Sequence, residues 1–289
     1  MNRRTFLSTA AASAVAANLP PVTAAVPASK AAPFQIACMT LPYSRFPLDR
    51  AIRGIQGAGY KFIAWGTSHR EEDEKQVPVL AADATPLAAK ELAKKCRDLG
   101  LETVLMFSGI YPEAKNGFAV LKQRILQAGA AGVPQVLTFG HTKGGNKELW
   151  IERLKMLAPI AQDNNVLLVV KQHGGETGTG EACAAITRAV NHPNIKVNYD
   201  AGNVLDYLDK DPIPDIKKCA DEVRSFCIKD HRNWPKDEDR GFGEIDHYRR
   251  RRRLDQARPR VPGSRRRGAT DKVIRAVWPR SAPRTPPRG

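Results

Sequence analysis

Two features that would place this chain in a special structural class are missing from its sequence. The five cysteines are scattered over 289 residues, odd in number, and no two of them have CxxC spacing. This usage argues against a disulfide scaffold and against a cysteine zinc cluster. The apolar run from Thr9 to Leu19 is too short for a membrane-spanning helix, which needs about 20 apolar residues. The length instead suits one large domain with a hydrophobic core.

Acidic residues are also scarce, with 30 Asp and Glu against 46 Lys and Arg, and the net charge is +16. Such a balance is typical of proteins that bind nucleic acids or membranes. The excess is local, however, because residues 249–289 contain fourteen Arg, one Lys and two acids, a net charge of +13. Residues 1–248 therefore carry a net charge of only +3. The charge supports nucleic-acid binding only for the tail, residues 249–289.

The N-terminus has the form of an export signal. Arg3 and Arg4 precede Thr5-Phe6-Leu7, an alanine-rich apolar run follows, and Val22-Thr23-Ala24 offers a small-residue cleavage site. We expect a twin-arginine signal peptide over residues 1–25, a linker over 26–33, and a periplasmic or extracellular protein. The alternative is an alanine-rich N-terminus without a targeting role.

From residue 34 to residue 248 the chain alternates short apolar runs with amphipathic segments. We expect strands at Phe34–Met39, Tyr60–Trp65, Leu101–Phe107, Gln135–Phe139, Val166–Val170, Ile195–Asp200 and Val223–Lys229. We expect helices at Leu48–Ala58, Pro86–Asp98, Phe118–Ala130, Glu148–Gln162, Glu181–Val190 and Pro214–Ala220. Gly59, Gly100 and Gly132 stand where glycines end helices. This pattern predicts a (β/α)₈ TIM barrel that lacks its eighth βα unit, with a three-layer open sheet as the alternative.

Residues 249–289 are rich in Arg and Pro and show no helical or strand period. Such a segment cannot bury a core, so we expect it to be disordered. The most economical explanation is a GC-rich gene read out of frame, which would have removed the eighth unit. A basic arm for nucleic acids or anionic surfaces and an ordinary solvated tail remain as alternatives.

Two of the expected strands end in residues able to perform chemistry. The run Val166–Val170 stops at Lys171, Gln172 and His173, and the run that ends at Tyr199 is followed by Asp200. Parallel strands bring their carboxyl ends to one rim, where α/β enzymes build their sites. Lysine and histidine there can orient a carbonyl or move protons. Asp200 suits a metal ligand, a general base or simply an Asx turn.

Further candidates follow the other strands. Lys229, Asp230 and His231 come after the last expected strand, and Glu244 lies in the glycine-spaced segment GFGEIDHY. Their shared position after successive strands favours one common rim. His69 and His141 also follow strands, where a pocket role and a structural role are both open.

Four motifs and the twin-arginine leader resemble one family. KQHGG (residues 171–175), NYDAGNVLDYL (198–208), FCIKDHRN (226–233) and GFGEIDHY (241–248) are similar to an exported subgroup of the xylose isomerase-like TIM barrels, the sugar phosphate isomerase/epimerase superfamily. The resemblance implies a divalent metal (Mn, Mg or Zn) at the strand ends and isomerisation or epimerisation of sugars through an enediolate. Some relatives eliminate from keto-sugars, and the endonuclease IV group cleaves DNA.

The chain departs from that family's metal ligands at several positions. Lys171 stands where the first Glu is expected, Asp200 matches the Asp, Asn203 replaces a His, and Cys227 replaces the His of the common HxKD pattern. The last Glu would lie in the missing unit. A metal site would then have to recruit His173, Asp230, His231 or Glu244, or be absent. The candidate ligands are Asp200, His173, His231 and Glu244.

The leading hypothesis is a metal-assisted proton transfer next to a sugar carbonyl. It assigns catalysis to Lys171, His173 and Lys229, and substrate binding to His69, His141, Asn203 and Asp230. The partner is a small sugar or sugar derivative, with no membrane span and with nucleic acid ranked last. The alternatives are a lyase acting on keto-glycosides and an inactive or non-enzymatic sugar-binding barrel.

Overall fold

The structure is a computed structural model that describes residues 34–229. Its helices and strands all belong to one compact unit that begins at Ile36. The expected signal peptide (1–25), linker (26–33) and basic tail (249–289) lie outside the described residues, as do Asp230, His231 and Glu244. None of the helices in the described range is long and apolar enough to cross a membrane.

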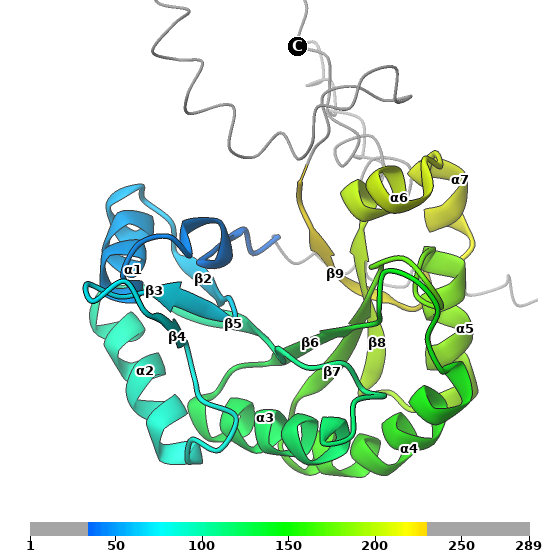
Figure 1. Ribbon diagram of the computed structural model, residues 1–289, viewed down its shortest axis with the longest axis horizontal. Helices are drawn as coiled ribbons and strands as arrows, with labels where there is room; N and C mark the ends of the chain where they lie inside the picture. The colour runs from blue at the N-terminus through cyan, green and yellow to red at the C-terminus, as the bar shows by residue number, and fades with distance from the viewer. Residues whose placement is uncertain (1–33, 230–289) are drawn as a thin grey trace, which may run out of the picture. The chain divides into compact units, whose positions relative to one another are not determined.

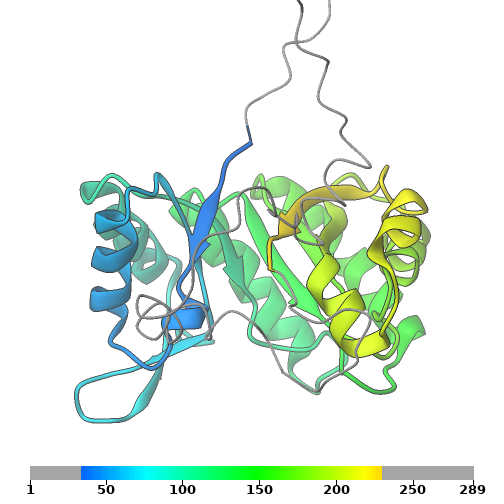
Figure 2. The same ribbon diagram turned by 90° about the horizontal axis from the view of Figure 1, so that it is seen from above.

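Seven parallel strands form a single sheet. They are β1 (Ala37–Met39), β2 (Phe62–Trp65), β5 (Glu102–Phe107), β6 (Gln135–Phe139), β7 (Leu167–Lys171), β8 (Ile195–Asp200) and β9 (Val223–Cys227). Their order across the sheet is the same as along the chain, and the sheet curls into a half-barrel with β1 and β9 at its edges (Figures 1 and 2). A doubly wound open sheet would reverse its strand order at a switch point. The predicted incomplete (β/α)₈ barrel is therefore confirmed, and the open-sheet alternative is excluded.

Helices follow the strands and cover the outer side of the curved sheet (Figure 1). They are α1 (Leu48–Gly57), α2 (Pro86–Asp98), α3 (Gly117–Ala131), α4 (Lys147–Asp163), α5 (Gly180–Val190) and α7 (Pro212–Lys217). The first five match their predicted ranges to within one residue at each end. Gly59, Gly100 and Gly132 have φ angles of 83°, 75° and 73°, which is the left-handed conformation expected of glycines after helices.

The sequence pattern missed four short elements. These are the 3₁₀ helix η1 (Leu41–Tyr43), the hairpin strands β3 (Ser68–Arg70) and β4 (Gln76–Pro78), and helix α6 (Ala201–Leu208). Helix α6 starts directly at the end of β8, with Asp200 as its N-cap. Because Gly202 and Asn203 are typical turn residues, this segment reads as a loop in the sequence.

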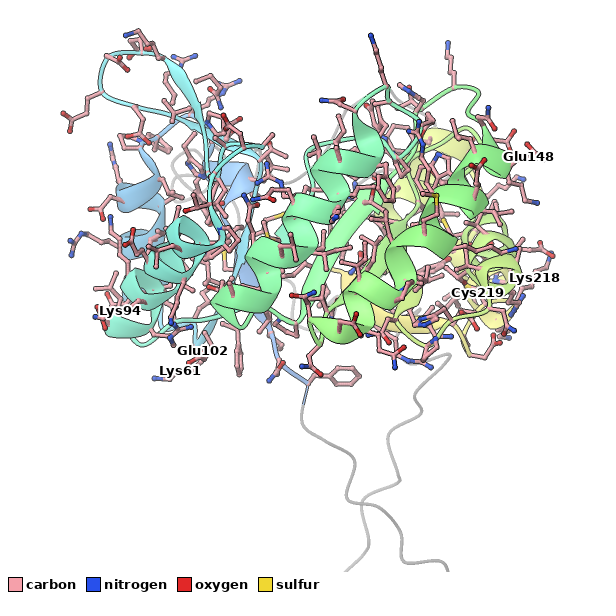
Figure 3. The ribbon with its side chains drawn as sticks, turned by 90° about the horizontal axis from the view of Figure 1, so that it is seen from below. Lys61, Lys94, Glu102, Glu148, Lys218 and Cys219 are labelled. Atoms are coloured by element: carbon pink, nitrogen blue, oxygen red, sulfur yellow. The ribbon has the colours of Figure 1, made fainter. Side chains whose placement is uncertain are left out.

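The core has two layers, one on each side of the sheet. The outer layer packs the strands against the helices and includes Leu168 and Val170, whereas the inner layer on the concave side includes Val169. Successive side chains of a strand point to opposite faces. Lys171 therefore continues the inner row of β7, at the carboxyl end of the strands. Lys61 and Glu102 mark the opposite, N-terminal end of β2 and β5 (Figure 3).

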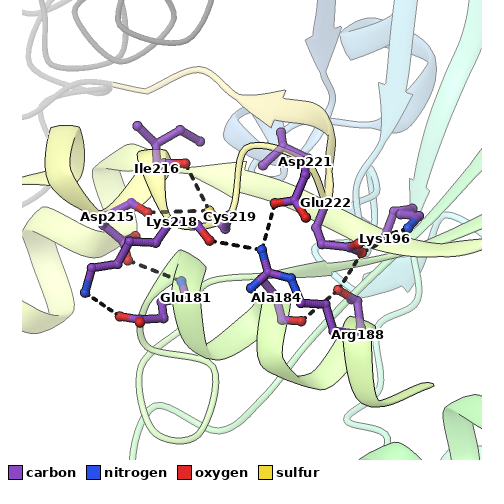
Figure 4. Close-up of polar contacts among 12 residues, drawn as sticks. Glu181, Ala184, Arg188, Lys196, Asp215, Ile216, Lys218, Cys219, Asp221 and Glu222 are labelled. Atoms are coloured by element: carbon purple, nitrogen blue, oxygen red, sulfur yellow. Dashed lines mark hydrogen bonds and ion pairs between the residues drawn. The ribbon is translucent and has the colours of Figure 1, made fainter. Parts of the chain in front are cut away.

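A polar network on the outer side fastens the last helices to the sheet. The Asp215 carboxylate accepts hydrogen bonds from the backbone N–H of Gly180 (2.7 Å) and of Glu181 (3.2 Å) at the start of α5. Lys218 pairs with Glu181 at 2.6 Å. In the segment before β9, Asp221 pairs with Arg188 of α5 at 2.7 Å and Glu222 pairs with Lys196 of β8 at 3.0 Å (Figure 4). This network holds α5, β8 and the segments around α7 together on the outer side of the sheet.

Candidate active site

Three charged side chains from neighbouring strands meet on the concave side. Lys171 is the last residue of β7, Asp200 is the last residue of β8, and Lys229 lies two residues after β9. The Lys171 Nζ atom lies 3.3 Å from Asp200 Oδ2, and the Lys229 Nζ atom lies 3.6 Å from the same oxygen. Only 9%, 0% and 11% of the Lys171, Asp200 and Lys229 side chains are exposed. We call these three residues the charged cluster.

Backbone and amide groups fix the Asp200 carboxylate in place. Its Oδ1 atom accepts a hydrogen bond from the Asn203 backbone N–H at 2.9 Å and so caps α6. The Asp200 backbone N–H donates to the Gln172 side-chain oxygen at 2.7 Å. The Asn203 side chain donates to the Gln172 carbonyl and accepts a hydrogen bond from the Lys229 ammonium. Asn203 is buried, and its hydrogen bonds link Asp200, Gln172 and Lys229, while its expected role in substrate binding stays a prediction.

The environment of Lys171 keeps its side chain protonated. Burial alone would lower the pKa of Lys171, but the nearby Asp200 carboxylate offsets this effect, and the pKa is raised above its usual value. The ammonium also lies 5.1 Å and 5.7 Å from the ring centroids of Phe107 and Phe139. Burial and the charge of Asp200 raise the pKa of the neighbouring Cys227 thiol to about 12. Cys227 is therefore a neutral thiol here and Lys171 a permanent cation.

His173 presents one defined nitrogen as a proton acceptor. Its Nδ1 atom lies 2.8 Å from the Gly140 carbonyl oxygen. Because a carbonyl can only accept, Nδ1 carries the proton and Nε2 keeps its lone pair. Burial lowers the pKa of His173, and the charges of Lys171 and Lys229 lower it further, against the opposing effects of the Gly140 hydrogen bond and Asp200. The imidazole is therefore neutral at pH 7.

Glycines hold the loop that carries His173. Gly174 and Gly175 have φ angles of 84° and 48°. A Cβ atom on Gly175 would lie 2.1 Å from the Gly144 carbonyl oxygen, and one on Gly174 would lie 2.4 Å from the Thr142 carbonyl oxygen. Only glycine fits such a close approach between the loops after β6 and β7. The two glycines of KQHGG thus let the loop after β7 pack closely against the loop after β6, and this packing fixes the position of His173.

Aromatic rings run along the same rim. Phe139 lies 4.5 Å from His173 and 5.7 Å from Tyr111 between ring centroids, Tyr111 lies 4.0 Å from His141, and Tyr207 lies 5.2 Å from His173. We call these five residues the aromatic wall. They come from β6, α6 and the loops after β5, β6 and β7. Tyr111 and Tyr207 were not predicted as site residues, although each follows the end of a strand, which is the one signal that could have found them.

The two remaining predicted histidines differ in their surroundings. His69 is fully buried in β3, and its Nδ1 atom lies 2.9 Å from the Phe46 carbonyl oxygen, so its described contacts fasten the loop before α1. His141 is exposed, and its Nε2 atom lies 3.8 Å from Glu113 Oε1. The structure brings Lys171, His173, Asp200, Asn203 and Lys229 together. His141 is linked to these residues by its ring contact with Tyr111 in the aromatic wall.

The described residues do not fit a divalent metal at Asp200. Within residues 34–229, no group of three or more His, Cys, Asp or Glu side chains is placed to hold a metal ion. One Asp200 oxygen is bonded to a backbone N–H, and the other faces two ammonium groups. At about 4 Å and an effective dielectric constant of about 20, each ammonium would repel a divalent cation by about 8 kcal/mol. Of the expected ligands, His231 and Glu244 stay predictions.

Comparison with known proteins places this geometry in a family. The family model described as "Xylose isomerase-like TIM barrel" matches residues 52–258. No curated protein matches the sequence. Among solved structures, a xylose isomerase-like TIM barrel protein from Mycobacterium smegmatis in complex with magnesium has a TM-score of 0.54 at 20% identity, covering 68% of this chain and 75% of that one.

Two further structures share the fold. The probable 3-DHS dehydratase AsbF from Bacillus anthracis, involved in petrobactin synthesis, has a TM-score of 0.54 at 14% identity, covering 70% of this chain and 76% of that one. An L-ribulose 3-epimerase has a TM-score of 0.52 at 17% identity, with coverage of 68% and 69%. At these identities the likeness establishes the fold alone. The family model spans most of the sequence, and the chain belongs to the xylose isomerase-like TIM barrel family.

Proposed function

We propose that this protein is a sugar isomerase/epimerase-type enzyme that moves a proton at a carbon next to a sugar carbonyl. The observation that carries the proposal is the buried charged cluster beside a histidine whose acceptor nitrogen is fixed. The family supports the sugar substrate, since one structural neighbour is an L-ribulose 3-epimerase. The described residues do not fit a metal at Asp200, so the proposed steps use only side chains of the protein.

Lys171 and Lys229 would act on the carbonyl oxygen. When a proton leaves the adjacent carbon, the C–H electron pair moves toward the carbonyl and negative charge develops on its oxygen. Fixed positive groups in a water-poor site stabilise such charge without reorganising. Asp200 lies 3.3 Å from Lys171 and 3.6 Å from Lys229 and holds the two ammonium groups in position, and it favours the charged form of Lys171.

His173 would take and return the proton. Its Nε2 lone pair accepts the proton from carbon while the Nδ1–H bond to Gly140 keeps the ring oriented. Return of the proton to the former carbonyl carbon, with transfer of the adjacent hydroxyl proton to the former carbonyl oxygen, gives an isomer. Delivery of a proton to the original carbon from the other face, by a second acid such as a lysine ammonium, gives an epimer. The aromatic wall offers apolar ring faces beside these polar groups, a combination common in small-molecule sites.

The test is proton exchange in heavy water. The full chain is incubated with a panel of aldoses, ketoses and keto-sugar derivatives in D₂O, and deuterium at the carbon next to the carbonyl is followed by NMR. We expect incorporation with the wild type and not with His173→Ala. A well-folded wild type that exchanges no member of the panel would overturn the proposal and favour a non-enzymatic sugar-binding barrel.

A second candidate is elimination from a keto-glycoside. It begins with the same proton abstraction, but a leaving group on the next carbon departs and takes its proton from an ammonium such as Lys229. The similarity in fold to a probable 3-DHS dehydratase supports elimination as the second candidate. Identification of the product separates the two, because elimination gives an unsaturated sugar and a released alcohol or water.

We also propose that the protein acts after twin-arginine export, on the basis of Arg3 and Arg4 in the leader sequence. Cell fractionation of the wild type and of an Arg3→Lys/Arg4→Lys variant tests this. Retention of the wild type in the cytoplasm would contradict it.

A further inference from the structure

We infer that the Lys171 ammonium takes the place of a divalent cation at the Asp200 carboxylate, so that proton transfer at this site needs no metal ion there. The inference deepens the proposed function, on which its catalytic part rests. Its structural part, the exclusion of a metal from Asp200, stands on the geometry of the charged cluster alone.

The position of Lys171 is fixed by strand β7 and by the groups around its side chain. Lys171 belongs to a strand and points to the inner side of the sheet, and only 9% of its side chain is exposed. Its ammonium lies beside the rings of Phe107 and Phe139, 5.1 Å and 5.7 Å from their centroids. It also lies 3.3 Å from Asp200 Oδ2. A side chain enclosed in this way is a built part of the site and not a surface lysine that happens to approach a carboxylate.

A divalent metal at Asp200 would need oxygen ligands from the residues around it. Mg²⁺ demands about six oxygen ligands at about 2.0–2.1 Å in octahedral geometry. Around Asp200, the Gln172 side-chain oxygen accepts a hydrogen bond from the Asp200 N–H, and Asp200 Oδ1 accepts one from the Asn203 N–H. The Asn203 side-chain oxygen accepts from Lys229. Each of these three oxygens therefore already uses one of its two lone pairs to accept a hydrogen bond from the protein.

Asp200 Oδ2 is the remaining oxygen of this carboxylate. It is buried and has no aligned hydrogen bond among the described residues, which would make it the natural ligand atom. Yet the ammonium groups of Lys171 and Lys229 lie 3.3 Å and 3.6 Å from it. The negative charge on this oxygen is therefore already balanced by two ammonium groups of the protein itself.

An ammonium group can do less than a metal ion at this position, but it can do what proton transfer next to a carbonyl requires. An ammonium can stabilise negative charge on one oxygen and can donate hydrogen bonds to it, which is what enolate formation requires. A metal could additionally chelate two substrate oxygens. The neighbouring fold from Mycobacterium smegmatis was solved with magnesium, so the shared fold does not itself forbid a metal. Within residues 34–229, it is the two ammonium groups beside Asp200 that oppose a metal there.

Binding of Mn²⁺, followed by the electron paramagnetic resonance signal of the free ion, tests the inference without any turnover. The full chain is stripped with a chelator and titrated as wild type, Asp200→Asn, Lys171→Glu and the Lys171→Glu/Asp200→Asn double variant. Lys94→Glu is the matched control, because this substitution makes the same change of charge on the exposed face of α2. There Lys94 pairs with Asp98.

We expect wild type and Asp200→Asn to bind Mn²⁺ equally, within twofold. Lys171→Glu should bind at least tenfold more tightly, and the gain should vanish in the double variant and be absent from Lys94→Glu. Mn²⁺ binding by the wild type that disappears in Asp200→Asn would overturn the inference, as would a folded Lys171→Glu variant without any gain. Should that variant not fold, the comparison of wild type with Asp200→Asn decides alone.

A second measurement concerns catalysis. Deuterium exchange by the chelator-stripped wild type should remain within twofold of the untreated protein, whereas a tenfold loss restored by Mn²⁺ or Mg²⁺ would overturn the catalytic part. If no sugar is exchanged at all, the proposed function fails, and the Mn²⁺ titration still decides whether Lys171 occupies the cation position at Asp200.

Discussion

Lys171 and Asp200 lie on the same inner face at the ends of neighbouring strands, and their Nζ and Oδ2 atoms are 3.3 Å apart. The pairing of β7 with β8 sets Lys171 opposite Asn198. Asp200 is two residues further along β8, so its side chain points to the same face as that of Asn198. Strand register alone therefore brings the two charges together, and no loop has to fold in to make the pair.

The first prediction tests Lys171 as the group that stabilises charge on the substrate oxygen. Lys171→Met keeps the length and apolar packing of the side chain but removes its charge. We expect kcat/KM to fall about 10²–10³-fold, the usual effect of removing one fixed donor to a developing oxyanion. Steady-state kinetics on the substrate found by the exchange assay measure it. Lys94→Met, on the exposed face of α2, is the control, and a loss below threefold in Lys171→Met would contradict the assigned role.

The second prediction concerns pH. The base must be neutral to accept a proton, and the pKa of His173 is lowered by burial and by the facing Lys171 and Lys229, against the opposing Asp200. The neutral form thus persists below the ordinary histidine pKa of about 6.5. We expect the acid limb of kcat/KM to have its midpoint below pH 6.5. A midpoint above pH 7, or an acid limb that survives in His173→Gln, would speak against His173 as the base.

The third prediction separates stability from chemistry. The Tyr199 hydroxyl lies 2.8 Å from Asp215 Oδ2 and 3.0 Å from the Pro212 carbonyl, on the outer side of β8. Tyr199→Phe should lower the free energy of unfolding by about 1.5–3 kcal/mol, the range for a hydrogen bond to a charged group. Urea denaturation measures this, with the exposed Tyr60→Phe as the control. Exchange activity of folded Tyr199→Phe should be unchanged, because the inner face is untouched.

Much of this architecture could be predicted from the sequence, because it follows from periodicity. Apolar runs marked all seven strands, and the glycines at 59, 100 and 132 marked the places where helices end. The rim position of Lys171 and Asp200 followed from their place after buried strands. Such inferences depend only on alternation along a strand and on parallel pairing.

What the sequence could not give depends on side-chain partners. His69 and His173 both follow apolar runs, yet one ring is fully buried at the Phe46 carbonyl while the other lies beside the charged cluster. No local pattern distinguishes them, since loop geometry decides which way each ring turns. Likewise, the sequence could not show that Asp200 caps a helix, because an aspartate two residues before a glycine equally predicts a turn.

The last prediction concerns the loop that positions His173. Gly175→Ala places a Cβ atom 2.1 Å from the Gly144 carbonyl oxygen at a φ angle of 48°, so the backbone of the loop has to move. Gly59→Ala is the matched control, because Gly59 also has a positive φ angle, 83°, but nothing lies within 4 Å of its added Cβ. Both variants pay for the left-handed conformation, about 1 kcal/mol, and only Gly175→Ala also suffers the clash. We expect both to lose stability in urea denaturation, but kcat should fall at least tenfold in Gly175→Ala alone, since a base displaced by about 1 Å loses its reaction geometry. Full activity in a folded Gly175→Ala variant would show that the position of His173 does not limit the reaction.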